Sequence, residues 1–539
     1  MRGKSTHHSV LSLSTLVVAV AMAVSACGGG GGGADEVAVD TPAPTVPPVT
    51  GIGSGSATTP PPANGTGTGT GSGTIVPPAA GTPPVVAGQH VCAALPAMPT
   101  KPANVLKVTD FGARGDDGND DMPAIQAALN AAQPGQWIVF PAGRYIHSKS
   151  IKVTKPGVVL WSEGATLHGS NVADQAVWLE ADGASVYNFT MTAVTDKRRT
   201  TPWESRISIF GGTNPRKLLK NNVIRNNRVI NGGERGTSLA NASGSAGIFV
   251  YNATQFLVAE NTVQRSLADA IHITAGSYNG RVLKNTVKEP GDDLIAMVSY
   301  IGDPSMDASR VNSEFDSRRA RDLVHDVLVA NNDVSGNYWG RGITVVGGES
   351  ITIENNKIAK TYHSAGMYFA RELSYLTFGV RDVLARNNTI SDVQNSAPAY
   401  TPVGFNFRTT GHGGVEIYSH MFADEATYPK LQDGLAVERI RLENNTISRV
   451  KTDGVRIGNG SGRNFTSSGR AATGGRVGQI ALVNTRLQDV NGQTMNILSQ
   501  PTAQKNVLIT GSTDDGAPYS NPLSSGGEPN VTGAEVTCQ

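Results

Sequence analysis

Asn355-Asn356-Lys357-Ile358 belongs to a family of short Asn-rich blocks that recur along the chain and decide its fold. The others are Asn226-Asn227-Arg228-Val229, Glu260-Asn261-Thr262-Val263, Lys284-Asn285-Thr286-Val287, Asn331-Asn332-Asp333-Val334, Asn387-Asn388-Thr389-Ile390 and Asn444-Asn445-Thr446-Ile447. Val263 to Val287 is 24 positions, Val287 to Val334 is 47, or two such steps, and Val334 to Ile358 is again 24. A fixed period of roughly 20–50 residues marks a solenoid. The blocks are β-rich and turn-bounded, which predicts an all-β parallel β-helix with one coil per period.

A second ladder of small residues followed by alternating apolar positions supports the same register. Gly247-Ile248-Phe249-Val250 and Ala270-Ile271-His272-Ile273 are two of its members. Alternation in a strand sends one set of side chains inward and the other outward. The outward set, which we expect to form one stripe along a flat face, is Phe249, His272, Ala296, Thr344, Tyr368, Glu416 and Arg456. The Asn blocks are expected to stack at a corner, where their amides can hydrogen-bond along the ladder.

Composition narrows the class of partner. The 539 residues carry a net charge of +1, so nothing indicates a polyanionic partner, and we expect no nucleic-acid binding. Aromatic residues are few at 6% and glycines number 63, which suits a β-solenoid with many turns. We expect the protein to be a monomer.

The N-terminus has the pattern of an export signal. Arg2 and Lys4 precede a mostly apolar stretch over 10–24, and Ser25-Ala26-Cys27 follows. This resembles the bacterial lipobox, which implies a lipid on Cys27 and a membrane anchor; the alternative is an ordinary signal peptide with an incidental cysteine. Because Gly28 follows rather than Asp, we expect the outer membrane. The predicted segments are a signal peptide (1–26), a flexible Gly/Pro/Thr-rich tether (27–100), the β-helix (101–500) and a C-terminal tail (501–539).

Two further cysteines, Cys92 and Cys538, flank the folded region. An exported chain meets an oxidising compartment, so a disulfide between them is one prediction and two unpaired thiols the other. The bridge requires Cα atoms within ~7 Å, and therefore a tail that folds back along the solenoid.

The stretch from Val108 to Tyr145 reads as the entrance to the solenoid. It contains Asp110-Phe111-Gly112-Ala113, an acidic run over 116–121, a helical pattern from Met122, and Pro141-Ala142-Gly143-Arg144-Tyr145. Asp121 is expected to cap this helix. The segment resembles the N-terminal region of the pectate-lyase-like superfamily of right-handed parallel β-helices. That resemblance implies the fold but no particular activity, and the helix would cap the open end of the core.

Acidic residues interrupt the second ladder on two successive coils. Asp269 precedes Ala270, and Asp292 with Asp293 precedes Leu294. The ladder steps from 247 to 270 to 294 are 23 and 24 positions, so Asp269 and Asp293 hold equivalent places on adjacent coils. Like charges this close push pKa values apart, so one carboxyl can stay protonated as an acid while its neighbour stays ionised as a base. A metal ion or a nearby Arg would also neutralise the cluster.

At these positions the chain is similar to polygalacturonase-type glycoside hydrolases, which carry NTDGI(D)I, then GDDCIAI, then GHG(I/L)SIGS and RIK. The corresponding segments here are Leu267-Ala268-Asp269-Ala270-Ile271-His272-Ile273, Gly291-Asp292-Asp293-Leu294-Ile295-Ala296-Met297, Gly340-Arg341-Gly342-Ile343-Thr344-Val345 and Val455-Arg456-Ile457-Gly458. The resemblance implies that Asp292 is the general acid and that Asp269 and Asp293 activate a water. It implies inverting hydrolysis, for which the carboxyl groups need a gap of ~6.5–9.5 Å.

The departures from that family concern its substrate-binding residues. Arg341 stands where the family has His, and Gly458 where it has Lys. From Asp293 to Arg341 is 48 positions, about twice the family's step, so an extra coil or a loop is expected between them. Residues 306–321 are charged and irregular and are expected to form a loop that overhangs the face. Since the family's Lys and Arg bind the uronate carboxylate, a different sugar or a different reaction is indicated.

The outward stripe and its surroundings supply candidate sugar-binding residues: His272, Arg341, Tyr368, Arg371, Glu416 and Arg456, with Tyr362, His363 and Glu372 as a wall beside them. His412, in a Gly-His-Gly, is interpreted as a coincidence or a rim residue.

Three functions remain open. The first is a surface-anchored glycoside hydrolase acting on an acidic or neutral polysaccharide, which needs no metal and no cofactor. The second is a polysaccharide lyase, in which the three aspartates could hold calcium and an Arg would neutralise a uronate. The third is a non-catalytic β-helix that binds glycan or serves as a surface scaffold.

Overall fold

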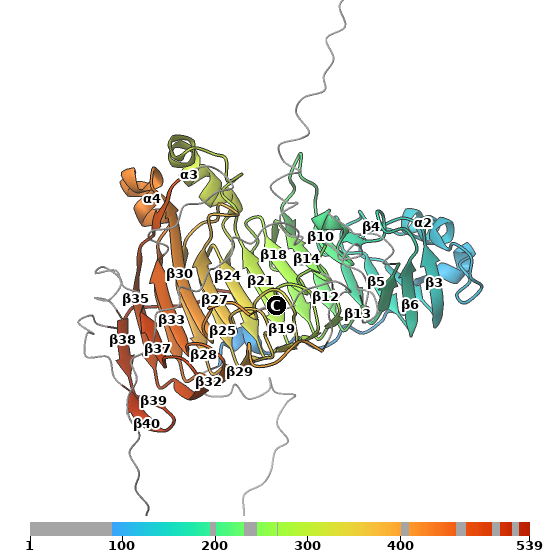
Figure 1. The fold of residues 1–539 in the computed structure, drawn as a ribbon. Coiled ribbons are helices and arrows are strands. Elements are labelled where there is room, and N and C mark those ends of the chain that lie inside the picture. The colour runs from blue at the N-terminus through green and yellow to red at the C-terminus, as the bar shows by residue number, and fades with distance from the viewer. Residues whose placement is uncertain are drawn as a thin grey trace, which may run out of the picture.

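The chain folds into a right-handed parallel β-helix, seen here in a computed structural model. The structure describes residues 89–194, 201–230, 245–266, 268–399, 409–459, 470–497, 507–519 and 528–538. The predicted signal peptide, Cys27 and most of the predicted tether lie outside these residues. Within the described part, three parallel sheets run the length of an elongated solenoid whose strands stack in chain order from the N-terminal to the C-terminal end (Figure 1). Each complete coil passes through the three sheets in the order A, B, C, and two coils contribute two short strands each to sheet A.

Sheet A comprises β1 (Leu106–Lys107), β2 (Trp137–Phe140), β5 (Val159–Ser162), β8 (Ser185–Tyr187), β11 (Leu219–Lys220), β12 (Val223–Arg225), β15 (Ala253–Thr254), β16 (Leu257–Ala259), β19 (Tyr278–Leu283), β22 (His325–Ala330), β25 (Gly348–Glu354), β28 (Val380–Arg386), β31 (Val437–Glu443), β35 (Val477–Val483) and β38 (Val507–Thr510). Sheet B comprises β3 (Gly143–His147), β6 (Ala165–Gly169), β9 (Thr190–Ala193), β13 (Arg228–Ile230), β17 (Thr262–Gln264), β20 (Thr286–Lys288), β23 (Asp333–Ser335), β26 (Lys357–Ala359), β29 (Thr389–Val393), β32 (Thr446–Val450), β36 (Arg486–Val490), β39 (Ser512–Asp514) and β40 (Ala517–Tyr519).

Sheet C comprises β4 (Ile151–Val153), β7 (Val177–Leu179), β10 (Ile207–Phe210), β14 (Ile248–Tyr251), β18 (Ile271–Thr274), β21 (Ile295–Val298), β24 (Ile343–Val346), β27 (Met367–Arg371), β30 (Val415–Phe422), β33 (Val455–Asn459), β37 (Met495–Ile497) and β34 (Ala472–Gly474), of which β34 pairs antiparallel with β30. The helices are α2 (Met122–Ala131), α3 (Ala308–Asp322) and α4 (Pro429–Gly434), with single 3₁₀ turns η2 (Val91–Ala93), η3 (Val108–Phe111), η4 (Pro202–Glu204) and η6 (Glu425–Thr427).

The repeat read from the sequence is the register of sheet B. Val263 pairs with Val287, Val287 with Val334, and Val334 with Ile358, and these side chains are buried in the continuous core. The interpretation of the 47-residue interval as two steps is therefore wrong, because β20 pairs directly with β23. That coil spans 47 positions where its neighbours span 24, and most of the additional residues form α3 between sheets C and A.

The predicted Asn ladder is confirmed at the corner between sheets A and B. The side-chain amide of Asn285 donates to Asn332 Oδ1 at 3.0 Å, and that of Asn332 donates to Asn356 Oδ1 at 2.9 Å. The same bond joins successive members of the whole ladder: Asn227, Asn261, Asn285, Asn332, Asn356, Asn388 and Asn445. The residue before each member turns the corner with positive φ, as at Asn331 (59°), where Asn is among the better tolerated side chains.

The outward stripe of sheet C is in the expected register but is not exposed. His272 pairs with Ala296, Ala296 with Thr344, and Thr344 with Tyr368. His272, Thr344, Tyr368 and Glu416 are all buried. Strand alternation thus predicted which side chains leave the core, but not that other parts of the chain would cover them.

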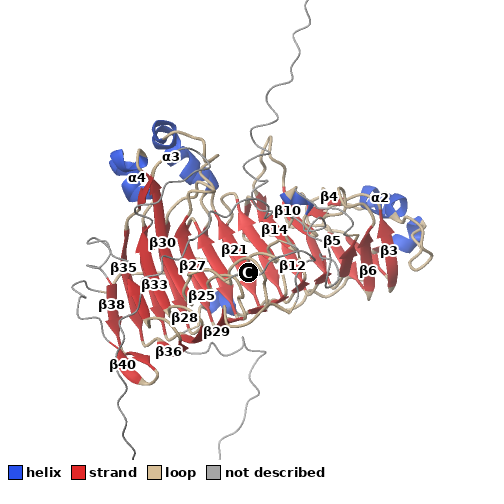
Figure 2. Cartoon of the chain, viewed as in Figure 1, coloured by secondary structure: helices blue, strands red, loops and turns tan. Residues whose placement is uncertain are grey.

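Helix α2 lies at the N-terminal end of the core, as expected, with Ile125 and Leu129 buried (Figure 2). The capping role expected of Asp121 is wrong. Its carboxylate accepts the N–H groups of Arg114 (2.7 Å) and Ile146, and Asp120 instead accepts the N–H of Met122. Asp121 therefore joins the entrance loop to the first coil.

The irregular loop expected over 306–321 is also wrong. Asp307 caps α3 by accepting the N–H of Arg310, and Glu314 forms ion pairs one turn away on either side. The apolar side of α3, formed by Val311 and Phe315, packs in a separate small hydrophobic cluster that includes Leu431 of α4. α3 and α4 stand beside each other off the end of sheet C near β30 (Figure 2).

Both ends of the folded region run over the outer side of sheet A. Cys92 packs with Leu283 and Leu328, and the tail returns to the same place, where Ala534 donates to Thr352. The disulfide between Cys92 and Cys538 is confirmed, with Cα atoms 4.9 Å apart. In the described residues, no helix is both long and apolar enough to cross a bilayer.

Candidate active site

Three aspartates converge where sheet B turns into sheet C. Asp269 lies two residues before β18 begins. On the next coil, Asp292 and Asp293 lie three and two residues before β21 begins. One carboxylate oxygen from each lies within 4.8 Å of the others. Asp269 and Asp293 are 7% and 4% exposed, whereas Asp292 is half-buried. The predicted convergence is confirmed, but the expected gap of ~6.5–9.5 Å is wrong for these nearest oxygens.

Hydrogen bonds fix the two buried carboxylates. Asp269 Oδ1 accepts the backbone N–H of Asp293 at 2.9 Å, and Asp269 Oδ2 is bonded to His272 Nδ1 at 2.6 Å. Asp293 Oδ1 accepts the N–H of Arg341 at 2.6 Å, and its Oδ2 accepts the hydroxyl of Thr344 at 3.0 Å. Among the described residues, no side chain or backbone group donates to the Asp292 carboxylate. Two aspartates are thus held in place and the third is left to meet solvent.

The electrostatics of the cluster favour the protonated form of its carboxyl groups. Burial raises the pKa of Asp292 well above its usual value, and the charges of Asp269 and Asp293 raise it further. Burial and then the charge of Asp293 likewise raise the pKa of Asp269. A carboxyl held in this way can donate a proton at a pH where an ordinary Asp cannot.

Arg341 lies on the coil directly after Asp293, because β21 pairs with β24. The extra coil considered between them does not exist, and the inserted segment is α3. The Arg341 guanidinium forms an ion pair with Glu372, lies 3.8 Å from Asp293 Oδ1, and covers the ring of Tyr368 at 4.6 Å. A cation of fixed charge therefore stands where the resembling family has a His.

The turn that carries Arg341 closes tightly over Asp292. Asn337 donates to the backbone carbonyls of Asp292 (3.1 Å) and Arg341 (2.9 Å). A Cβ at Gly340 would collide with the Asp292 carboxylate and with the backbone of Asp292 and Asp293. Gly340 is thus required by close approach to the half-buried acid.

The predicted sugar-binding residues divide into a group of five beside the aspartates and a single residue, Arg371, that is buried elsewhere. His272, Arg341, Tyr368, Glu416 and Arg456 follow one line along sheet C on successive coils or beside it. All but Arg341 and Arg456 are buried, and each contacts protein neighbours. Glu416, for example, accepts the N–H of Gly413 and lies 3.4 Å from Arg456.

The assignment of Arg371 to substrate binding is wrong. Its side chain is 0% exposed and is held by Glu425 (2.9 Å), the carbonyl of His420 (2.6 Å) and that of Thr377. Arg371 is the structural link between β27 and the α4 region. Strand alternation was a usable signal, because Arg371 has the same parity in β27 as the core residues Met367 and Phe369.

Aromatic residues near the aspartates were missed by the sequence interpretation. Trp339, two residues before Arg341, is half-buried and stacks on His363 at 4.4 Å. His412, interpreted as a coincidence or a rim residue, has its ring 5.5 Å from Tyr368. The signal available was the rarity of tryptophan, of which the chain has 5.

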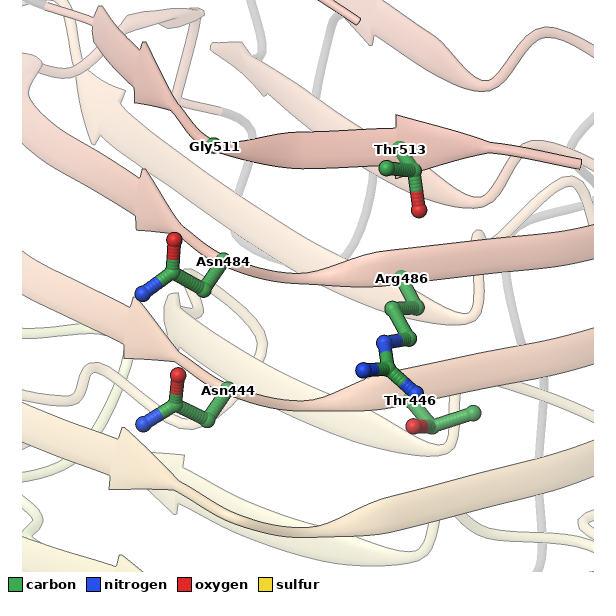
Figure 3. Close-up of a pocket in the computed structure, with 6 residues that line it drawn as sticks. All are labelled: Asn444, Thr446, Asn484, Arg486, Gly511 and Thr513. Atoms are coloured by element: carbon green, nitrogen blue, oxygen red, sulfur yellow. The ribbon is translucent and has the colours of Figure 1, made fainter. Parts of the chain in front are cut away.

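The structure also contains a pocket that lacks this chemistry. It has a volume of about 540 Å³ and is lined by Asn444, Thr446, Asn484, Arg486, Gly511 and Thr513 at the corner between sheets A and B of the last coils (Figure 3). The Asn and Thr side chains come from neighbouring coils, and Arg486 points toward Thr446. It offers no carboxyl or imidazole, so the aspartate cluster carries the candidate chemistry.

Comparison with known proteins places the chain in a family. Residues 105–397 match the family model described as rhamnogalacturonase A/epimerase, pectate lyase-like. Two mannuronan C5-epimerases of Azotobacter vinelandii, AlgE1 and AlgE3, are 36% and 37% identical over 77 and 79 residues, 14% of this chain in each case. The matched segments span only 5% and 4% of those proteins.

A solved structure shares the fold. The catalytic unit of the GH87 α-1,3-glucanase of Streptomyces thermodiastaticus superposes with a TM-score of 0.51 at 14% identity, over 80% of this chain and 73% of that one. The superfamily expected from Val108 to Tyr145 is confirmed, since the family match begins at residue 105 and covers more than half of the chain. The chain belongs to the rhamnogalacturonase A/epimerase, pectate lyase-like family.

Proposed function

We propose that this protein is a polysaccharide hydrolase in which Asp292 is the general acid. The observation that carries the proposal is the contrast within the cluster. Asp292 is half-buried and accepts no hydrogen bond from the described residues, while its two neighbours are buried and have one hydrogen bond at each carboxylate oxygen. The raised pKa of Asp292 supplies the proton that a leaving sugar oxygen requires. Membership of a family named for a glycan hydrolase and an epimerase supports a carbohydrate substrate.

Asp269 and Asp293 then hold and activate the attacking water. Each of their oxygens accepts one hydrogen bond and retains a second lone pair for water. Because the side chains of Asp269 and Asp293 are buried, neither is placed to attack a sugar carbon itself. We therefore infer that water attacks directly and that the anomeric configuration is inverted. The short spacing requires the water to sit on the solvent side of the buried pair.

The charges around the cluster favour a neutral sugar over a polyuronate at the cleavage point. Arg341 is paired with Glu372, and Arg456 lies 3.4 Å from Glu416. The third cation expected there, Arg371, is buried elsewhere. A polysaccharide lyase needs a cation that neutralises the uronate carboxylate, and the expected arginines are already neutralised.

The lyase alternative also involves calcium. Three carboxylate oxygens within 4.8 Å would suit this ion, which takes oxygen ligands at ~2.3–2.6 Å. Asp269, Asp292 and Asp293 would hold it, and it would neutralise a uronate. However, Arg341 already brings a positive charge to 3.8 Å from Asp293. Activity that survives a chelator supports hydrolysis, and activity that is lost with it and restored by calcium supports the lyase.

The test is a panel of neutral and acidic polysaccharides assayed with wild type and Asp292→Asn. Hydrolysis releases new reducing ends without an unsaturated product, whereas a lyase generates ultraviolet absorbance from the unsaturated uronide. Proton NMR of the first product gives the anomeric configuration. If Asp292→Asn turns over an established substrate at the wild-type rate, the general-acid assignment is wrong. Turnover by no member of the panel would favour the glycan-binding or scaffold alternative.

We also propose that the protein is a monomer anchored in the outer membrane through a lipid on Cys27. The supporting feature is the lipobox-like Ser25-Ala26-Cys27 after an apolar stretch. The mass of the mature N-terminus and fractionation of a Cys27→Ser variant test the anchor. Recovery of wild type in the soluble fraction would contradict it.

A further inference from the structure

A row of aromatic side chains lies on the outer side of sheet C, on the N-terminal side of the aspartates. It runs from Trp178 on β7 to Phe210 on β10 and Tyr251 on β14, with ring centroids 5.5 and 5.4 Å apart. Trp203, from the turn before β10, stacks on Phe210 at 5.2 Å with the two rings 7° from parallel. Aromatic rings on successive coils thus form a continuous apolar strip.

The strip leads to the aspartate cluster. Phe249, next to Tyr251 in the packing of the strip, pairs with His272 in the sheet and stacks on its ring at 5.6 Å. His272 is bonded in turn to Asp269. From Trp178 to His272 is three strand steps, or about 14 Å along the solenoid axis. The aromatic row and the aspartate cluster therefore lie on the same side of the solenoid, one after the other along its axis.

The two tryptophans form the accessible layer of this row. Phe210, Phe249 and Tyr251 are buried, whereas Trp178 and Trp203 are half-buried. Because Phe210 covers one face of the Trp203 indole, the exposed part of Trp203 lies on the side away from Phe210. A flat, partly exposed ring of this kind can bury the apolar C–H face of a pyranose.

The charge on this strip is low. Lys152 lies over Trp178 at 4.1 Å, and Arg216 lies over Tyr251 but is paired with Asp322 at 2.5 Å. A face that held a polyuronate would need a free cation for each acidic sugar, and among the described residues the strip offers one, Lys152, at its far end. Its chemistry is that of a site for uncharged sugar units.

We propose that Trp178 and Trp203 are binding platforms for successive neutral sugars of the polysaccharide, which lies along sheet C with its cleavage point at Asp292. This deepens the proposed function and rests on it for the position of the cleavage point. The indoles supply most of the affinity for the chain, and the aspartates supply the chemistry.

A second aromatic row serves as a matched control. Trp137, Trp161 and Tyr187 stack on the outer side of sheet A at 5.0 and 5.6 Å. The N-terminal segment crosses that face, where Lys101 pairs with Glu163, the residue that follows β5 and lies two positions after Trp161. Trp161 is a half-buried tryptophan on the same solenoid, on a face without the aspartate cluster.

The experiment measures binding in an Asp292→Asn background, which prevents turnover, by affinity electrophoresis of the full chain. The probes are three neutral polysaccharides (dextran, galactomannan and xyloglucan) and two acidic ones (alginate and polygalacturonate). We expect binding to a neutral probe that weakens about tenfold with Trp178→Ala or Trp203→Ala. Trp203→Phe, which keeps a flat ring, should recover part of the affinity, and Trp161→Ala should match the parent. Circular dichroism of each variant confirms its fold.

The outcomes separate the two proposals. In one outcome, binding depends on the tryptophans but the wild-type protein shows no turnover that depends on Asp292. That result supports the tryptophan platforms and contradicts the proposed hydrolase. In the other outcome, the protein turns over a neutral polysaccharide and neither tryptophan variant changes that turnover. That result contradicts the tryptophan platforms and supports the proposed hydrolase. The platforms are also overturned if no neutral probe binds, if only acidic probes bind, or if Trp161→Ala weakens binding as much as Trp203→Ala.

Discussion

Replacing Asp292 with Asn should make the protein more stable and far less active. One oxygen from each aspartate lies within 4.8 Å of the others, and at that distance a pair of like charges in an effective dielectric of about 20 costs about 3.5 kcal/mol. Asp292 has two such neighbours, so its full ionisation would cost about 7 kcal/mol. Protonation and the nearby Arg341 relieve much of this. We therefore expect the substitution to raise the free energy of unfolding at pH 7 by about 1–3 kcal/mol.

The sign of the effect depends on pH. Because the pKa of Asp292 is raised in the folded protein above 3.8, the folded state holds a proton that the unfolded state has released. Wild-type stability from this group is complete below pH 3.8 and is lost as pH rises through the folded pKa. Asp292→Asn has no such loss, so its advantage should be absent at the acid end and greatest above the folded pKa.

Two assays check the two halves of the prediction. Thermal unfolding at several pH values gives the stability difference, and reducing-end release on an established substrate gives the rate. Loss of a general acid costs about 10²- to 10⁴-fold in turnover. In wild type, turnover should also fall as pH rises through the raised pKa, since the acid must carry its proton.

Asp293→Asn is the matched control and should move stability in the opposite direction. Asp293 accepts hydrogen bonds from Arg341 and Thr344, and an amide can accept only one of them, so a loss of about 1–3 kcal/mol is expected. Equal stability changes in the two variants, or an Asp292→Asn protein that is destabilised at every pH, would refute the view of Asp292 as the strained, unbonded member of the cluster.

Three other perturbations test the scaffold and the turn over the acid. Asn332→Ala removes a side chain that makes five ladder and backbone hydrogen bonds, and chemical denaturation should show a loss of about 3–5 kcal/mol; a loss below about 1 kcal/mol would contradict the ladder's role. Cys92→Ser, like Cys538→Ser, opens a disulfide loop of 446 positions, and chain entropy limits the stabilisation from closing such a loop to about 6 kcal/mol. We expect either substitution to lower the free energy of unfolding by about 2–4 kcal/mol, and a reductant to have the same effect on wild type. An unchanged melting temperature would show that the ends are held by packing alone. Gly340→Ala places a Cβ against Asp292 and should lower kcat while the fold is retained, whereas normal turnover would show that the turn yields freely.

The interior of this protein could be predicted from the sequence because the interior is periodic. A coil must return to the same corner, so the Asn ladder and the inward Val and Ile positions repeat whatever the loops between them do. The convergence of Asp269 and Asp293 followed from the same arithmetic. Their hydrogen bonds fixed the spacing of the carboxyl groups, and no count of residues contains that information.

The exterior could not be predicted in this way, because it is built by insertions of unequal length. Arg371, expected beside the stripe, is buried because Glu425, in the insertion that also carries α4, forms an ion pair with it. The helix over 308–322 was hidden by its charge, although Val311 and Phe315 stand one turn apart and predict an apolar side. Within the stripe, Tyr368 is covered by the Arg341 guanidinium and lies against the His412 ring, both from loops, so strand alternation alone could not reveal its burial.

The longest of these insertions also explains the main departure from the polygalacturonase pattern. The 48 positions from Asp293 to Arg341 separated the two residues by an apparent extra coil, yet β21 and β24 are neighbours. With α3 set aside, Arg341 occupies the coil after the acids, as the histidine does in that pattern. A guanidinium keeps its charge at every accessible pH, whereas an imidazole loses it near pH 6.5. This chain therefore has a permanent cation beside the acids where that pattern has a titratable group, and Glu372 already balances its charge.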